Sequence, residues 1–131
     1  MEQTAYGFGK KVDLPYEQAI ERTKAALKTQ GFGVLTEIDV AKTMKEKLDV
    51  DFQPYIILGA CNPPLAHKAL TAELEIGLLL PCNVIVHQEG SGSRVMAMDP
   101  EAALGIVQNP VLVEVAAEAK ARLQRALEEL S

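Results

Sequence analysis

The sequence predicts an α+β fold in two layers, with a mostly antiparallel sheet of about five strands and helices on one face. Apolar residues alternate in some segments, as in strands, and recur at three- and four-residue spacing in others, as in helices. The two kinds of segment interchange along the chain without a repeat or a linker, and the last two strands follow each other across a turn. The length of 131 residues suits one domain covering residues 1–131.

The first strand and the first helix are expected before residue 32. Residues 4–12 place Tyr6 and Phe8 at alternate positions, which is the pattern of a strand. Residues 14–30 then carry apolar side chains at helical spacing, which predicts one buried stripe. Gly31 can adopt the left-handed backbone conformation that ends a helix.

Two further strands are expected around a short helix. Residues 32–38 alternate again and predict a strand. Residues 39–48 predict a helix that Asp39 caps, with Val40, Met44 and Leu48 on one side. Residues 55–60 are almost continuously apolar, which favours a strand in the centre of the sheet.

The segment after the third strand predicts another helix. Asn62, Pro63 and Pro64 form its start, and it runs to Ala72. Its buried face is expected to carry Leu65, Ala69 and Leu70. Residues 76–80 are apolar but fit neither periodicity, so the sequence does not assign them.

The C-terminal third predicts a hairpin followed by helices. Residues 83–87 and 94–98 read as strands, and the Gly- and Ser-rich residues 89–93 between them as a turn. Asp99 and Pro100 begin a short helix, because Asp is a good cap and proline fits the first turn. Residues 110–130 keep helical spacing to the end of the chain.

Composition argues against nucleic-acid and membrane partners. The net charge is -5, and no basic stripe is interleaved with aromatic residues, as phosphate binding requires. The longest apolar stretch, residues 74–86, is too short to span a bilayer and is interrupted by Glu75 and Pro81. The first residues lack a secretory signal. We therefore expect a cytoplasmic protein with reduced thiols.

Two cysteines, the only ones in the chain, occur in similar contexts. Cys61 is followed by Asn62 and Pro63, and Cys82 by Asn83. The start of a helix lowers the pKa of a nearby thiol, because the helix dipole stabilises the thiolate. His67 follows within the first two turns. The candidate catalytic residues are Cys61, Cys82 and His67, and the candidate binding residues are Asn62, Pro63 and Asn83.

The direction of two strands decides whether the cysteines form one site. If the strands before Cys61 and after Cys82 are antiparallel, the two thiols meet at one end of the sheet. If the strands are parallel, the thiols lie ~20 Å apart. A shared site allows redox chemistry, a metal bound by both thiols and His67, or a thiol that binds or attacks a small ligand. Metal binding is the weakest alternative because the spacing matches no familiar zinc motif. Alternatively, each cysteine is a small buried hydrophobic residue.

Four segments together resemble the domain-of-unknown-function family 302 of bacterial and archaeal proteins. These segments are residues 31–39, 57–66, 77–84 and the Asp99-Pro100 pair. The resemblance implies a two-layer α+β domain with a curved antiparallel sheet, similar to the TATA-binding-protein-like arrangement. It also implies that Cys61, Asn62, Pro63, Pro81, Cys82 and Asn83 occupy signature positions. It implies no established activity.

Three functions therefore compete. The first is a thiol-dependent enzyme or redox-responsive protein that uses Cys61 and Cys82. The second is a domain that binds a small apolar ligand between the sheet and a helix. The third is a homodimeric interaction module, if the apolar residues 76–80 stay exposed. The sequence implies no cofactor and does not decide whether the protein is an enzyme.

Overall fold

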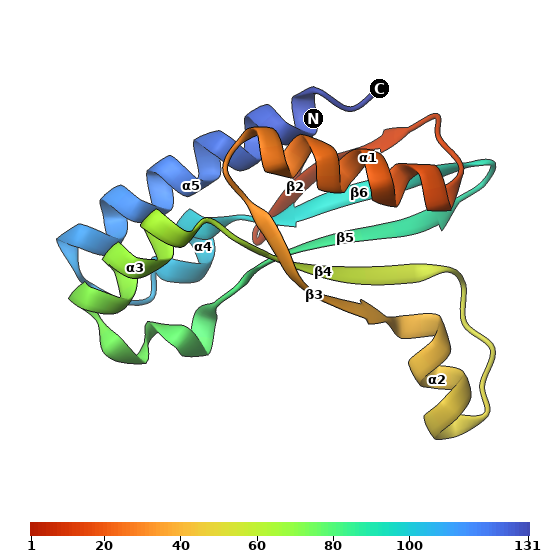
Figure 1. Ribbon diagram of the computed structural model, residues 1–131, viewed down its shortest axis with the longest axis horizontal. Coiled ribbons are helices and arrows are strands. Elements are labelled where there is room, and N and C mark those ends of the chain that lie inside the picture. The colour runs from red at the N-terminus through yellow and green to blue at the C-terminus, as the bar shows by residue number, and fades with distance from the viewer.

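The computed structural model describes residues 1–131 and contains one antiparallel sheet with the strand order β1-β2-β6-β5-β4-β3 (Figure 1). The strands are β1 (Glu2–Gln3), β2 (Gly7–Val12), β3 (Gly33–Asp39), β4 (Tyr55–Cys61), β5 (Cys82–Glu89) and β6 (Gly92–Met98). The predicted α+β fold with an antiparallel sheet is confirmed. The sheet has six strands rather than about five, because the two residues of β1 are too few to show an alternating pattern.

The helices are α1 (Tyr16–Thr29), α2 (Val40–Leu48), α3 (Pro63–Ala72), α4 (Pro100–Leu104) and α5 (Pro110–Glu128), with a 3-10 helix η1 (Leu74–Leu79). The long helices α1 and α5 lie side by side over one face of the sheet, as the sequence predicts (Figure 1). Side-chain caps begin several helices at the expected residues. Asp39, Asn62 and Asp99 each accept a hydrogen bond from a backbone N–H of the first turn. No helix is long and apolar enough to cross a membrane.

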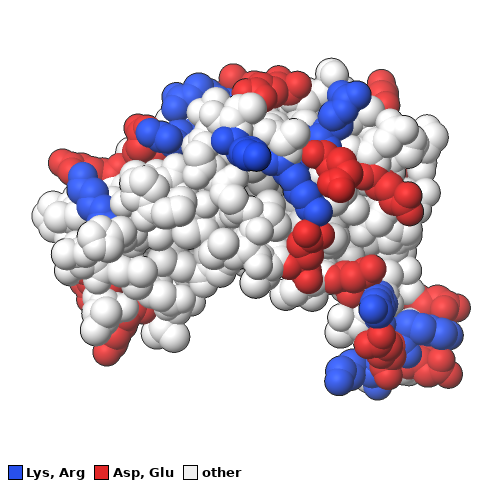
Figure 2. Space-filling view, in the orientation of Figure 1, with Lys and Arg blue, Asp and Glu red and all other residues white.

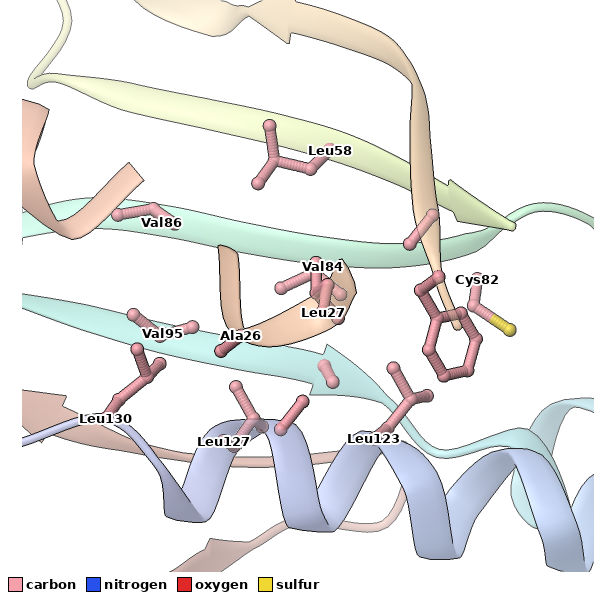
Figure 3. Packing of buried hydrophobic residues seen from close by; sticks show 14 of the residues in the cluster. Ala26, Leu27, Leu58, Cys82, Val84, Val86, Val95, Leu123, Leu127 and Leu130 are labelled. Carbon is pink, nitrogen blue, oxygen red and sulfur yellow. The ribbon is translucent and has the colours of Figure 1, made fainter. Parts of the chain in front are cut away.

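The main core fills the space between the sheet and these two helices. Leu58 and Val84 point from the sheet towards Leu27 of α1, and α5 contributes Leu123 and Leu127 (Figure 3). All five side chains are fully buried. Burial of an aliphatic side chain of this size contributes about 1.5–3 kcal/mol. The core therefore holds the strands in a fixed register against the helices.

A second, smaller core lies beyond one end of the sheet. Ala69 of α3, Ile76 of η1 and Leu104 of α4 pack there against the first half of α5. The unassigned residues 76–80 thus belong mostly to a 3-10 helix that buries Ile76. The expected burial of Leu70 is wrong, because Leu70 is exposed. Helix α3 buries only the narrow side that carries Ala69. We call residues 63–80, which contain α3 and η1, the lobe.

Helix α2 projects from the opposite end of the sheet and packs mainly against β3 and β4 (Figure 1). None of its nine residues is buried. Val40 and Met44 are half-buried, but Leu48 on the same side is 65% exposed. We call residues 40–52, which comprise α2 and the segment after it, the arm. The arm and the lobe border a hollow on the surface of the molecule (Figure 2).

Candidate functional site

The pairing of β4 with β5 determines where the two cysteines lie. The strands are antiparallel, and Ala60 is paired with Cys82. Cys61 is the next residue along β4 and is also its last residue. The structure therefore has the antiparallel arrangement, in which the two cysteines come to the same end of the sheet.

The two cysteines differ in burial because side chains alternate along a strand. Cys82 shares the core face with Ala60 and Val84 and is buried, with its sulfur at the margin of the main core (Figure 3). Cys61 follows Ala60, leaves β4 in the opposite direction, and is half-buried. Both thiols are free. This alternation does not favour a disulfide between them, although their backbones are neighbours.

Both cysteines line one cavity of about 330 Å³. It lies between the end of the sheet, the lobe and helix α5, where the two cores meet. Its walls are almost entirely apolar. The lining side chains that project from the different elements include Phe32, Leu35, Thr36, Leu65, Ala66, Ala69, Leu80, Leu104 and Val115.

Of the three candidate binding residues, Asn62 lines this cavity. Its Oδ1 accepts a hydrogen bond from Leu65 N at 3.2 Å, which caps α3. Its Nδ2 donates to the backbone oxygen of Gln30 at 3.4 Å. The other two candidates point elsewhere: Pro63 is exposed at the start of α3, and Asn83 is exposed on the sheet face opposite α1 and α5. The binding roles of all three remain predictions.

Burial keeps both thiols protonated near neutral pH. Burial raises the pKa of Cys61. Burial, followed by the nearby Cys61, raises the pKa of Cys82 to about 11. A lowered pKa was expected for Cys61 from the start of α3, and this expectation is wrong. The side chain of Asn62 already occupies one N–H of the first turn, and two prolines there have no N–H to offer.

His67 lies apart from the two thiols in this arrangement. It is exposed on α3 and does not line the cavity. No three His, Cys, Asp or Glu side chains gather closely enough to hold a metal ion. Cys61, Cys82 and His67 therefore do not form the metal site considered from the sequence. A catalytic role for each of them remains a prediction.

The side of the cavity that β3 contributes was not predicted from the sequence. The register between β3 and β4 shifts between Val34 and Thr36, so Leu35 is an extra residue that has no partner on β4. Thr36 then lies over Gly59, and a Cβ at position 59 would be 2.1 Å from Thr36 Oγ1. A glycine inside an apolar strand indicates such a close approach, and Gly59 is the signal that could have revealed it.

Comparison with known families assigns the chain to a family. Residues 8–130 match the model of the family described as "Domain of unknown function DUF302". The chain belongs to the DUF302 family. The resemblance of the four sequence segments to this family is thereby confirmed.

A solved DUF302 structure has the same fold. It is described as an uncharacterized conserved protein DUF302 from Bacillus stearothermophilus and is 32% identical to this chain. The match covers 98% of this chain and 100% of that chain, with a TM-score of 0.89. A search of curated proteins finds no match. The DUF302 comparisons therefore supply the fold but no activity.

Proposed function

We propose that this DUF302 protein binds a small, uncharged and mostly apolar molecule in the cavity beside Cys61 and Cys82. The observation that carries the proposal is the cavity itself, which has a volume of about 330 Å³ and apolar walls. Small-molecule sites are usually concave and apolar, with a few polar groups that fix the orientation of the ligand. The cavity lies between two packed cores, which hold its walls in place.

The lining of the cavity favours a neutral ligand. No Lys, Arg, Asp, Glu or His side chain contributes to it. An ionised group placed there would lose its hydration without gaining a partner, which costs much more than burying a neutral group. The hydroxyl of Thr36 and the amide of Asn62 provide the polar side-chain contacts. The expected ligand is thus an apolar body with at most one neutral polar group, such as an alcohol.

The state of the thiols favours binding over covalent chemistry. The nucleophile in thiol chemistry is the thiolate, and the raised pKa values of Cys61 and Cys82 keep both thiols protonated near neutral pH. A protonated thiol behaves as a small, polarizable apolar group and suits the wall of such a cavity. A thiol-dependent reaction is the second candidate, supported by the presence of both cysteines at one cavity. A cytoplasmic location, where thiols stay reduced, is compatible with both.

Titration with a neutral fluorescent probe, phenylnaphthylamine, tests the proposal. We expect saturable one-to-one binding with enhanced fluorescence, which octanol displaces and octanoate does not displace at neutral pH. Ala66→Phe fills the cavity and should weaken probe binding at least about tenfold, or about 1.4 kcal/mol. Ala72→Phe adds the same side chain on α3 outside the cavity and should bind like wild type. Absence of saturable binding to wild type would contradict the proposal.

A further inference from the structure

We propose that two copies of this chain form a closed homodimer with two-fold symmetry. In this dimer the arm of each copy packs against the lobe of the other and covers the mouth of its cavity. The inference starts from two apolar surfaces that the isolated chain leaves uncovered.

The arm is the first of these surfaces. Helix α2 has nine residues and none is buried, whereas isolated helices shorter than about 12–15 residues are only marginally stable in water. Leu48, Val50 and Phe52 on the arm are exposed. The arm therefore lacks the tertiary packing that normally stabilises a short helix, and it offers an apolar surface to a partner.

The lobe is the second surface. Leu74 is 83% exposed and Leu78 is 86% exposed, and Leu70 beside them is exposed as well. Neighbouring exposed leucines of this kind mark interaction sites more often than isolated ones do. The arm and the lobe stand on opposite sides of the hollow, too far apart to cover each other within one chain (Figures 1 and 2). A second copy brings its own arm and its own lobe, so both surfaces can be covered at once.

Each of the two surfaces carries a charged side chain without an ion-pair partner, and the two charges have opposite sign. The ion pairs within the arm use Lys42 and Lys45 and leave Lys47 without a carboxylate partner. Glu75 on the lobe is exposed and pairs with no Lys or Arg of its own chain. A contact between the arm of one copy and the lobe of the other therefore brings opposite charges together.

The outer edge of the sheet lies in the same hollow. β3 is the last strand on this side, and the backbone groups on its outer edge have no strand to pair with. Leu35 on this edge is 68% exposed. A second copy seated in the hollow shields this edge. Because the arm–lobe contact is formed twice around one axis, assembly stops at two copies.

The dimer also completes the candidate ligand site. Leu35, Leu70 and Gly77 line the cavity and are exposed, so they form its mouth. The arm of the second copy would cover this mouth and exclude water from the cavity. This closing role rests on the proposed function, whereas the dimer itself does not.

Analytical ultracentrifugation without ligand tests the dimer. We expect a mass of twice 14.2 kDa for wild type. Leu48→Glu on the arm and Leu78→Glu on the lobe should each weaken association at least about tenfold. Val113→Glu alters a side chain on α5 that is about as exposed as Leu48 and lies outside both surfaces, and it should leave the dimer intact. Circular dichroism confirms that each variant is folded.

Mixing the two variants identifies the contact. The Leu48→Glu chain keeps an intact lobe, and the Leu78→Glu chain keeps an intact arm, so a mixed dimer retains one of its two contacts. An equimolar mixture should therefore associate more tightly than either variant alone. The proposal would be overturned if wild type is a monomer or if its mass grows beyond two copies. It would also be overturned if the mixture associates no more tightly than either variant alone. Probe titration separates the two proposals, because a monomer that binds the probe refutes only the dimer, and a dimer that does not bind it refutes only the ligand site.

Discussion

Ala60 of β4 is paired with Cys82 of β5, and this pairing brings both cysteines to the edge of one apolar cavity. β4 ends one residue later at Cys61, and β5 begins at Cys82. The alternation of side chains places Cys82 on the buried face and leaves Cys61 half-buried. The same register therefore explains why the two thiols share a cavity and differ in burial.

Replacing Cys82 by alanine should change how stability depends on pH. The ordinary thiol pKa is 9.0, and burial followed by the nearby Cys61 raises the pKa of Cys82 to about 11. Between these values the unfolded chain has lost a proton that the folded protein still holds, so wild-type stability falls as pH rises. The free energy of unfolding of wild type, relative to Cys82→Ala, should drop by about 2 kcal/mol over this range. Urea unfolding measures this difference, and parallel pH profiles for the two proteins would contradict it.

Alkylation of Cys61 should be slowed by a bound probe. Cys61 lines the cavity and is the more exposed of the two thiols. In the Cys82→Ala variant only Cys61 can react, and saturating phenylnaphthylamine should slow its reaction with iodoacetamide about tenfold, because the thiolate must form in an occupied site. Asn83→Cys in a chain without the natural cysteines provides the control, since position 83 is exposed on the other face of the sheet. If the probe slows both thiols equally, it is not in this cavity.

Adding a methyl group at Gly59 should destabilise the fold. A Cβ at this position would lie 2.1 Å from Thr36 Oγ1 and 2.9 Å from Pro81 Cγ. We expect Gly59→Ala to lower the free energy of unfolding by about 1–3 kcal/mol, as overpacking does. Adding Thr36→Ala should restore part of the loss. At Gly33 a Cβ would meet nothing within 4 Å, so Gly33→Ala should cost little. Equal losses for the two glycine variants would contradict the close approach of β3 to β4.

Asp99→Asn should destabilise the protein at neutral pH. Burial acts to raise the pKa of Asp99, but the hydrogen bond from Lys120 and two backbone N–H groups outweigh it and lower the pKa. The carboxylate therefore stabilises the fold above its ordinary pKa, and this contribution is lost as pH falls through the lowered value.

We expect Asp99→Asn to cost about 1–2 kcal/mol at neutral pH, because it removes the charge that pairs with Lys120 at 3.0 Å while Asn still caps α4. The difference from wild type should shrink in acid. Glu101→Gln removes the exposed partner of the same lysine and should change stability by less than about 0.5 kcal/mol. Thermal unfolding followed by circular dichroism measures both, and a loss that persists in acid would assign the effect to packing instead.

Most elements of the fold could be predicted from the sequence because their signals are local. Alternating or helical spacing marked the strands and the long helices, and Asp39, Asn62 and Asp99 cap helices where expected. Two features of the fold could not be predicted from the sequence because they depend on contacts between distant residues. β1 exists only through its pairing with β2, and Leu70 is exposed because it lies at the mouth of the cavity.

The candidate site could be predicted only in part. The sequence located Cys61 and Cys82, and the meeting of the two depended on a strand direction that the structure supplies. An apolar pocket between the sheet and a helix was one of the sequence-based hypotheses, but its position beside the cysteines could not be predicted, because its walls come from segments as distant as Leu35 and Val115. The expected direction of the pKa shift of Cys61 was wrong because burial, which depends on the whole fold, outweighs the local effect of a helix start.

The position of a bound probe in solution tests the central claim most directly. With methyl-labelled protein and phenylnaphthylamine, we expect intermolecular nuclear Overhauser effects from the probe to Leu80, Leu104 and Val115, which line the cavity. We expect none to Ile85 and Met96, which lie on the sheet face opposite the main core. Contacts confined to that other face, or no contacts under saturating probe, would contradict a ligand site beside the two cysteines.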